Sequence, residues 1–371
     1  MIIGVPRETR PDETRVAAVP ETVAKLIDKG HTLLIEQDAG AASFNTDAAY
    51  AAVGAQIVDG DTLYAKADLV LKVQRPRRLP DNRHEADRLK EKAWLVSFLQ
   101  PHEDPEAVEH LRARHITVLA MEAVPRIARA QKMDALSSMA NIAGYRAVLE
   151  ATQVFPRYMP LLMTAAGTVP PAQVLVIGAG VAGLSSIATA RRLGAQVKAF
   201  DVRPAVADQV KSLGGEFVSI EMPQFEAEDK GGYAKAASEE ILKREQALFE
   251  ELLPTVDIVI CTALVPGREA PRLITEKAVR SMKPGSVIVD LAVEQGGNCA
   301  LSKVGEAVRV DGTTILGWTN LPARMPADAS RLYAKNVLNL LMHMHNKEGW
   351  APDPTEEVTK AVMALRPGQE G

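Results

Sequence analysis

The fold is decided by the ten-residue stretch Val174-Leu175-Val176-Ile177-Gly178-Ala179-Gly180-Val181-Ala182-Gly183. Its first four residues are typical of a buried β-strand, its glycines form G-x-G-x-x-G, and a helical pattern follows at 184–193. In such a unit Gly178 allows a tight turn, Gly180 lets the backbone approach a pyrophosphate, and Gly183 lets the helix pack closely on the strand. The free N–H groups and the positive dipole end of that helix favour phosphate. The stretch therefore predicts a dinucleotide site, and a glycine turn without nucleotide is the alternative.

The next expected strand, Gln196–Phe200, leads into Asp201, which lies 21 residues beyond Gly180. A carboxylate at this point of the fold accepts hydrogen bonds from the hydroxyls of the adenine ribose. Its negative charge also repels the 2′-phosphate of NADP(H), so Asp201 favours NAD(H). Arg203 keeps the alternative open, because a guanidinium two residues later can receive that phosphate.

Outward from this unit, short β-rich runs alternate with helical patterns, which predicts an α/β fold with parallel sheets. In the first third the expected strands are Ile2–Val5, Thr32–Glu36, Asp68–Val73, Trp94–Phe98 and Thr117–Ala120. Past Pro170 they are Gln173–Ile177, Gln196–Phe200, Glu216–Val218, Asp257–Cys261, Ser286–Leu291 and Thr313–Gly317. Other expected helices are Pro20–Lys29, Pro105–Arg114, Met133–Gln153 and Ala329–His345.

These two blocks predict two Rossmann-like domains. The first covers 1–142 and is completed by 321–371, and the second, an NAD-binding domain, covers 143–320. The helix Ala329–His345 is expected to pack back on the first domain, which makes the second an insertion. The tail Ala351–Gly371 holds three prolines and many charges, so we expect it to be partly loose.

Composition narrows the class of protein. A length of 371 residues suggests two domains, and 47% hydrophobic with 24% charged residues is ordinary for a soluble protein. The net charge of −4 gives no general attraction for nucleic acid. No metal-ligand set is expected. No run of about 18 apolar residues occurs, so we expect no membrane span and a cytoplasmic location.

The segment Glu221–Ala237, which reads EMPQFEAEDKGGYAKAA, differs in composition from its neighbours. It is polar and acidic, and it contains Gly231, Gly232 and Tyr233. A polar loop with a glycine hinge and an aromatic side chain is typical of a lid over a site. A surface insertion without a functional role is an equal alternative from these residues alone.

Several motifs together resemble the alanine dehydrogenase/transhydrogenase superfamily. Besides the glycine motif they are Pro6-Arg7-Glu8, Glu13-Thr14-Arg15-Val16-Ala17, Leu264-Val265-Pro266-Gly267, the run 282–290 and Gln295-Gly296-Gly297. The resemblance extends over nearly the whole chain, from residue 1 to about residue 345. It implies two Rossmann-like domains with parallel sheets that flank a nucleotide-binding cleft.

The two branches of this superfamily need different chemistry. Alanine dehydrogenase must move a proton as well as a hydride, and the resemblance assigns that work to a lysine, a histidine and an aspartate. The corresponding positions hold Gln74, Gln100 and Glu294, and neither glutamine can transfer a proton. Arg15, which holds the substrate carboxylate in that branch, is present. An amino-acid dehydrogenase is the disfavoured alternative, as is a non-catalytic NAD-binding regulator.

The transhydrogenase branch fits the remaining residues, because hydride transfer between two nicotinamides needs alignment and exclusion of water rather than a proton donor. The segment Pro125–Ser138, PRIARAQKMDALSS, resembles the nicotinamide-binding loop of that branch. The resemblance implies that the nicotinamide and its ribose are held, and aligned for the reaction, by Arg126, Gln131, Asp134 and Ser137. The simpler alternative is a basic loop followed by a helix whose dipole favours Asp134.

The resemblance also implies the rest of the cofactor site and the partners. The residues implied to contact NAD(H) are Arg126, Ile127, Ala128, Gln131, Lys132, Met133, Asp134, Ser137, Gly178, Gly180, Val181, Ala182, Gly183, Asp201, Val202, Arg203, Gly232, Tyr233, Ala263 and Leu264. NADP(H) and the proton channel are expected on membrane-bound partner subunits, and a homodimer of this component is expected. Because the chain stops at Gly371 without a membrane segment, we expect the separate-subunit form, peripheral on the cytoplasmic face of the inner membrane.

Overall fold

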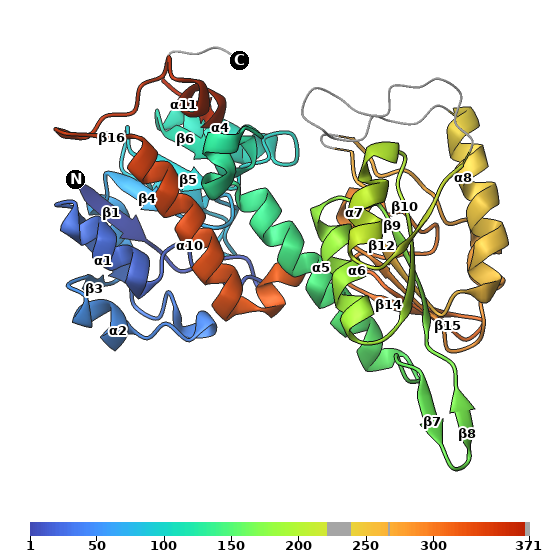
Figure 1. Cartoon of the computed structure of the whole chain (residues 1–371). Helices are drawn as coiled ribbons and strands as arrows, with labels where there is room; N and C mark the ends of the chain where they lie inside the picture. Colours follow the sequence, from blue (N-terminus) through green and yellow to red (C-terminus); the bar gives the residue numbers. More distant parts are fainter. Residues whose placement is uncertain (221–238, 266–267, 368–371) are drawn as a thin grey trace. The chain divides into compact units, whose positions relative to one another are not determined.

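The computed structural model describes residues 1–220, 239–265 and 268–367 (Figure 1). The chain divides into two compact units. Unit 1 consists of Met1–Met139 and Pro322–Gly371, and unit 2 consists of Ala140–Leu321. Because both ends of the chain belong to unit 1, unit 2 is an insertion in the sequence of unit 1.

Unit 1 is built on a seven-stranded sheet of order β18-β6-β5-β4-β1-β2-β3. Its strands are β1 (Ile2–Val5), β2 (Thr32–Glu36), β3 (Gln56–Val58), β4 (Leu69–Leu71), β5 (Trp94–Ser97), β6 (Thr117–Ala120) and β18 (Met363–Leu365). Neighbouring strands are parallel except β18 with β6. The inner strands are apolar along their length, as expected for a parallel sheet that is covered on both faces, and Val70, Leu95 and Val118 are fully buried.

The helices of unit 1 are α1 (Pro20–Asp28), α2 (Asp47–Ala52), α3 (Gly60–Lys66), α4 (Pro105–Ala113), α10 (Pro326–His343) and α11 (Glu357–Val362). Local sequence explains the start of α4, where Asp104 accepts a hydrogen bond from the Ala107 N–H and Pro105 occupies the first turn. Helix α10 packs on the rest of unit 1, and its Tyr333 hydroxyl donates to the Lys72 carbonyl at 2.8 Å.

Unit 2 is built on a second seven-stranded sheet, of order β11-β10-β9-β12-β13-β15-β14. Its strands are β9 (Gln173–Ile177), β10 (Gln196–Phe200), β11 (Glu216–Val218), β12 (Ile258–Cys261), β13 (Val287–Asp290), β14 (Ala307–Val310) and β15 (Thr313–Leu316). Neighbouring strands are parallel except β14 with β15. Its helices are α6 (Val181–Arg192), α7 (Ala207–Ser212), α8 (Glu239–Leu252) and α9 (Glu276–Arg280).

Helix α5 (Ala135–Val154) begins in unit 1 and continues in unit 2. Within unit 2 its Gly144 lies against the first turn of α6, where a Cβ would be 2.0 Å from the carbonyl oxygen of Ala182. The Ser186 hydroxyl donates to the Gly144 carbonyl at 2.9 Å. Glycine in the middle of a long helix costs stability relative to alanine, and this close approach is its physical reason.

The structure confirms the expected α/β class with two Rossmann-like sheets and corrects several details. The edge strands β14 and β18 are antiparallel, and β3 and the two small hairpins were not expected. The expectation of a loose tail is wrong over the described residues, because α11 buries Val358 and Val362 and β18 joins the sheet. Helix α6 starts at Val181 rather than residue 184, since Gly183 lies inside the helix.

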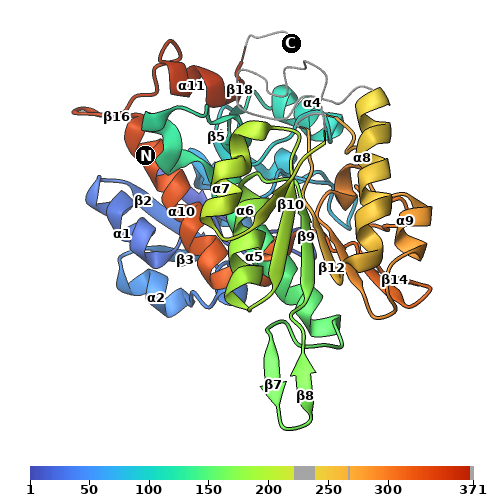
Figure 2. The ribbon, with the colours of Figure 1, turned by 45° about the vertical axis from the view of Figure 1, so that its right-hand side comes forward.

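The two hairpins are β7–β8 (Leu162–Thr164 and Gly167–Val169) and β16–β17 (His345–Asn346 and Gly349–Trp350). The β7–β8 hairpin projects away from the sheet of unit 2, which is clearest in Figure 2. Among the described residues, no helix combines the length and the apolar character that crossing a bilayer requires.

Candidate functional site

The glycine motif forms the turn between β9 and α6. Gly178 has a φ of +93°, which favours glycine, and a Cβ there would lie 2.7 Å from Thr262 Oγ1. A Cβ at Gly183 would lie 1.8 Å from the carbonyl oxygen of Gly178, so glycine is required for this close packing. A Cβ at Gly180 would have no neighbour within 4 Å. The backbone at Gly180 is therefore open to a ligand group, as a bound pyrophosphate requires.

The turn lies at the place where ligands bind in open α/β sheets, outside the carboxyl ends of the strands at a topological switch point. In unit 2 this point lies between β9 and β12, because the chain leads from β9 to β10 on one side and β12 pairs on the other. The Thr262 hydroxyl, directly after β12, donates to the Gly178 carbonyl at 2.8 Å. Ala263 and Leu264 continue along the same edge.

Asp201 follows β10 and is buried, with 8% of its surface exposed. Its Oδ2 accepts hydrogen bonds from the Ala179 N–H at 2.7 Å and from Arg203 Nη2 at 2.8 Å. Its Oδ1 accepts from the backbone N–H and from Nε of Arg203, both at 2.9 Å. The carboxylate thus lies beside the glycine turn, but each oxygen already accepts two hydrogen bonds. Ribose hydroxyls that bind Asp201 must share or replace the side-chain bonds from Arg203.

The segment 126–137 belongs to unit 1. Residues Ala128–Met133 form the 3-10 helix η4, and α5 begins directly after Asp134. Asp134 accepts hydrogen bonds from the Ser137 backbone N–H at 2.8 Å and from the Ser137 hydroxyl at 2.5 Å, which is the geometry of a helix N-cap. Arg126, Ala128, Gln131 and Lys132 are exposed, Ile127 is half-buried, and Met133 is buried.

The residues expected at the site fall into three groups. In unit 2 the structure brings the glycine turn, the first turn of α6 with Val181 and Ala182, the run Asp201–Arg203 and the pair Ala263–Leu264 to one edge of the sheet. In unit 1 it places residues 126–137 at the start of α5. Gly232 and Tyr233 lie outside the described residues.

Two family models match the chain. The N-terminal domain of alanine dehydrogenase/PNT matches residues 4–143, and the C-terminal domain of alanine dehydrogenase/PNT matches residues 147–369. The chain belongs to the alanine dehydrogenase/PNT family.

Within this family the chain is 52% identical over 344 residues to the first of the separate chains that make up the NAD(P) transhydrogenase alpha subunit of Rhodospirillum rubrum, with 92% of this chain and 89% of that protein covered. The crystal structure of a transhydrogenase from Sinorhizobium meliloti is similar with a TM-score of 0.87 and 42% identity, over 99% of both chains. The alanine dehydrogenase of Mycolicibacterium smegmatis is 30% identical, with 94% of this chain and 89% of that protein covered. The chain is more similar to these transhydrogenase proteins than to this dehydrogenase.

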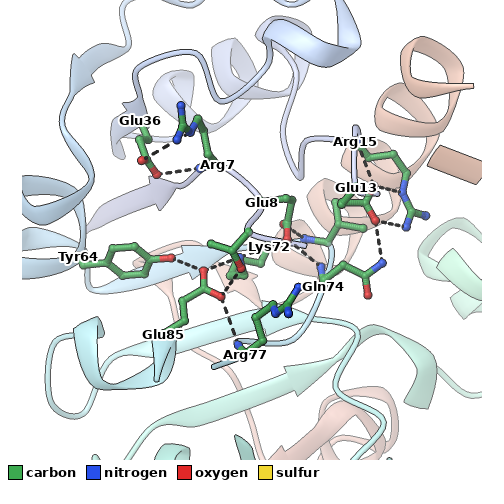
Figure 3. A network of polar contacts seen from close by, with 12 residues as sticks. Arg7, Glu8, Glu13, Arg15, Glu36, Tyr64, Lys72, Gln74, Arg77 and Glu85 are labelled. Atoms are coloured by element: carbon green, nitrogen blue, oxygen red, sulfur yellow. Dashed lines mark hydrogen bonds and ion pairs between the residues drawn. The ribbon is translucent and has the colours of Figure 1, made fainter. Parts of the chain in front are cut away.

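The positions that the resemblance links to alanine dehydrogenase chemistry contain a buried ion pair (Figure 3). Arg15 donates from Nε and Nη2 to the two carboxylate oxygens of Glu13, at 2.7 and 2.6 Å, and Gln74 Nε2 donates to Glu13 at 2.7 Å. Burial alone would raise the pKa of Glu13, but the hydrogen bond and the charge of Arg15 outweigh it and lower the pKa to about 2. Arg15 thus holds a carboxylate of the chain itself, which a substrate carboxylate would have to displace.

Sequence analysis missed Asn298, which holds the segment after β12. Asn298 is fully buried, its Oδ1 accepts from the Ala263 N–H at 3.1 Å, and its Nδ2 donates to the Ala263 carbonyl at 2.9 Å. Its own backbone N–H donates to the buried Asp290 at 3.2 Å. The available signal was its position directly after the family motif Gln295-Gly296-Gly297.

Sequence analysis also missed Glu245 on α8. It lies on the buried face of that helix with Ile241 and Phe249, and only 2% of its surface is exposed. Burial, followed by the negative charge of Asp201, raises the pKa of Glu245 to about 7. The available signal was a glutamate at a position where helical periodicity calls for an apolar residue.

Proposed function

We propose that this chain is the NAD(H)-binding component of a proton-translocating transhydrogenase. Hydride passes between NAD(H) on this chain and NADP(H) on a partner subunit, coupled to proton movement across the membrane. The observation that carries the proposal is the cluster of Arg15, Glu13 and Gln74. Where an amino-acid dehydrogenase needs a proton-transfer group the chain has a glutamine, and the arginine is bound to Glu13. The 52% identity to a NAD(P) transhydrogenase subunit supports the same conclusion.

The residues of unit 2 fit the adenosine and pyrophosphate of NAD(H). The open backbone at Gly180 admits a phosphate, and the first turn of α6, with Val181 and Ala182, offers N–H groups and a positive dipole end. Asp201 and Val202 are assigned to the adenine ribose, with Arg203 exchanging its bonds to Asp201 for the ribose hydroxyls. Contacts from Ala263, Leu264, Gly232 and Tyr233 complete this portion of the assignment.

We assign the nicotinamide and its ribose to the segment 126–137. The exposed Gln131 orients the nicotinamide, and the exposed Arg126 binds beside it. Ser137 and Asp134 bond to each other in the structure, and in the complex they exchange that bond for bonds to the ribose. The bound nicotinamide supplies the hydride chemistry. Because no proton moves at the reacting carbons, these side chains need only align the ring and exclude water.

A homodimer is supported by the exposed apolar residues that precede and begin the β7–β8 hairpin. Tyr158 is 60% exposed, Met163 is 78% exposed, and Val154 and Leu161 are also exposed. Large apolar side chains gathered on a surface mark interaction sites. In sedimentation experiments Met163→Glu should shift the protein toward the monomer and leave NADH binding unchanged. Membrane-bound subunits that carry the NADP(H) site hold the dimer at the cytoplasmic face of the inner membrane in this proposal.

The test is single-turnover hydride transfer from NADH to an oxidised NADP analogue, after mixing with the NADP-binding domain of the partner. We expect transfer only when both proteins are present, and no turnover of alanine, lysine or glutamate with NAD by the chain alone. Gln131→Asn should lower transfer about a hundredfold with NADH affinity nearly intact, since a misplacement of about 1 Å has an effect of that size. Amino-acid turnover by the purified chain would overturn the proposal.

A further inference from the structure

We propose that Asn336 and Asn339 of α10 are positioning residues, which hold the nicotinamide-binding segment in its reactive conformation through the carbonyl group of Lys132. The inference rests on the proposed function, because it takes 126–137 as that segment. It extends the proposed function to two residues that are assigned no contact with nucleotide. They lie 204 and 207 residues beyond Lys132 in the sequence.

The geometry is a convergence of two amides on one oxygen. Asn336 Nδ2 donates to the Lys132 carbonyl at 3.0 Å, and Asn339 Nδ2 donates to the same oxygen at 3.1 Å. Residues three apart on an α-helix share one face, so α10 presents both amides to η4. The neighbouring carbonyl, that of Gln131, accepts from the Asp134 N–H at 3.3 Å. The turn around Gln131 is therefore fixed by α10 on one side and by the start of α5 on the other.

Asparagine is a costly residue at position 336. Only 6% of its surface is exposed, and it lies in the interior of α10 among buried residues such as Tyr333, Val337 and Leu340. Asparagine lowers helix stability relative to leucine. Its Oδ1 is buried and has no hydrogen-bond partner among the described residues, and a buried acceptor without a partner also costs stability. Leucine would suit the helix and the core better, so the bond to Lys132 is what explains the asparagine.

The other anchor of this segment is weaker. Arg129 of η4 pairs with Glu356 at 3.2 Å and with Glu357 at 2.5 Å, at the start of α11. The Arg129 side chain is 55% exposed, and exposed ion pairs contribute little because water screens them. The two asparagine bonds, one of them from a buried side chain, are therefore the contacts that set the position of η4.

Precise placement matters more for hydride transfer than for affinity. The reacting atoms must be held in a near-attack geometry, and small displacements cost large factors in rate. Loss of both asparagine bonds frees residues 128–134 to take other conformations, while the adenosine and pyrophosphate contacts assigned to unit 2 still supply the affinity for NADH. The rate of transfer should therefore fall while the dissociation constant of NADH stays nearly the same.

The experiment compares Asn336→Leu, Asn339→Ala and the double variant in the single-turnover assay with the NADP-binding domain of the partner. Transfer should fall about tenfold in each single variant and about a hundredfold in the double variant, with NADH affinity changed less than about threefold. Asn339→Gln keeps the amide donor and should stay within about threefold of the wild-type rate. Lys335→Ala is the matched control, because this residue of the same helix pairs with Glu21 instead, and its rate should be that of the wild type.

Amide hydrogen exchange gives a second readout that needs no partner protein. Residues 128–134 should exchange at least about tenfold faster in the double variant and unchanged in Lys335→Ala. Asn336→Leu should melt no lower than the wild type, which excludes misfolding. Unchanged exchange and transfer in the double variant would overturn the inference, and so would a parallel loss of NADH affinity and transfer. If the wild type transfers no hydride, the proposed function fails and the positioning role fails with it, whatever the exchange rates show.

Discussion

The two units share one sheet design but use the same place in it in opposite ways. The switch point lies between β1 and β4 in unit 1 and between β9 and β12 in unit 2. In unit 1 the chain leaving β1 brings Glu8 next to Lys72, which directly follows β4, and Lys72 pairs with Glu8 at 3.2 Å and with Glu85 at 2.7 Å (Figure 3). In unit 2 the corresponding edge holds a glycine turn whose backbone at Gly180 is open.

The difference shows that the fold sets the place for a site, whereas side-chain size and charge decide whether that place is open. The ionic network of unit 1 is buried and internally satisfied, since the Val73 N–H donates to Glu8 at 2.6 Å and the Tyr64 hydroxyl donates to Glu85 at 2.8 Å. Burial would lower the pKa of Lys72, but the charges of Glu8 and Glu85 outweigh it and raise that pKa. The chain therefore fills one switch point with its own charges and leaves the other to a ligand.

The largest expected effect comes from closing the opening in unit 2. Gly183→Ala sets a methyl group against the backbone carbonyl of Gly178, 1.8 Å away before relaxation. Because backbone cannot yield as a flexible side chain can, we expect the free energy of unfolding to fall by about 4 kcal/mol or more and NADH binding to be lost. Denaturant titration and NADH fluorescence measure the two effects.

Gly180→Ala is the matched control for that substitution, because its methyl group meets open space. Its stability should stay within about 1 kcal/mol of the wild type. Its affinity for NADH should still fall at least about tenfold, since the methyl group occupies the approach of the pyrophosphate. Equal stability of the two variants would contradict the packing described for Gly183.

The second prediction opens the filled switch point of unit 1. Lys72→Met leaves Glu8 and Glu85 buried without their shared counter-charge, so the free energy of unfolding should fall by about 3–5 kcal/mol. The triple variant Glu8→Gln, Lys72→Met and Glu85→Gln should recover most of that loss, because replacing a whole buried network costs less than breaking it. Its NADH affinity should equal that of the wild type. A triple variant as unstable as Lys72→Met would show that the network does more than balance charge.

The third prediction uses the pH dependence of unit 2. Glu245 has a pKa of about 7 in the folded protein against an ordinary value of 4.5. The folded state therefore holds an extra proton between these values, so this group makes stability fall as pH rises from about 4.5 to about 7 and leaves it constant above. Glu245→Gln should exceed the wild type by about 2 kcal/mol at pH 8 and match it near pH 4.5. A difference that does not vary with pH in denaturant titrations would contradict the shift.

Most of the fold could be predicted because its signals are local. Strands β1, β2, β9 and β10 have the expected bounds, since each is an apolar run limited by turn residues. The short edge strands β3, β14 and β18 could not be predicted, because an edge position tolerates polar residues and leaves no apolar run. The pairing of β18 with β6 joins segments far apart in the sequence, which no local pattern reports.

The candidate site could be predicted only as far as spacing reaches. The spacing from Gly180 to Asp201 places a carboxylate beside the glycine turn, and the structure has the Ala179 N–H donating to it. The two hydrogen bonds that each oxygen of Asp201 already accepts depend on the rotamer of Arg203, which the sequence does not encode locally. Asn298 and Glu245 reach the site through tertiary packing, so no motif announced them.

The smallest expected effect concerns two arginine–carboxylate pairs, one in each unit. Arg15 pairs with Glu13, and Arg203 pairs with Asp201, each across one intervening residue. Arg203→Leu removes the side-chain donors from Asp201 and leaves acceptor positions for the ribose hydroxyls. It also leaves the negative charge of Asp201 without its counter-charge. NADH binding should tighten about threefold and NADPH binding should weaken about threefold, which together is about 1.4 kcal/mol of added preference.

Fluorescence titration of both nucleotides measures this preference, against a wild type that should already favour NADH at least about tenfold. Arg15→Leu is the matched variant in unit 1. It should leave both affinities unchanged and lower stability, because Glu13 is then buried without its counter-charge. If Arg203→Leu weakened NADH and NADPH binding equally, Arg203 would bind a phosphate that both nucleotides share. The choice between them would then rest on Asp201 alone, and the resemblance between the two pairs would carry no functional meaning.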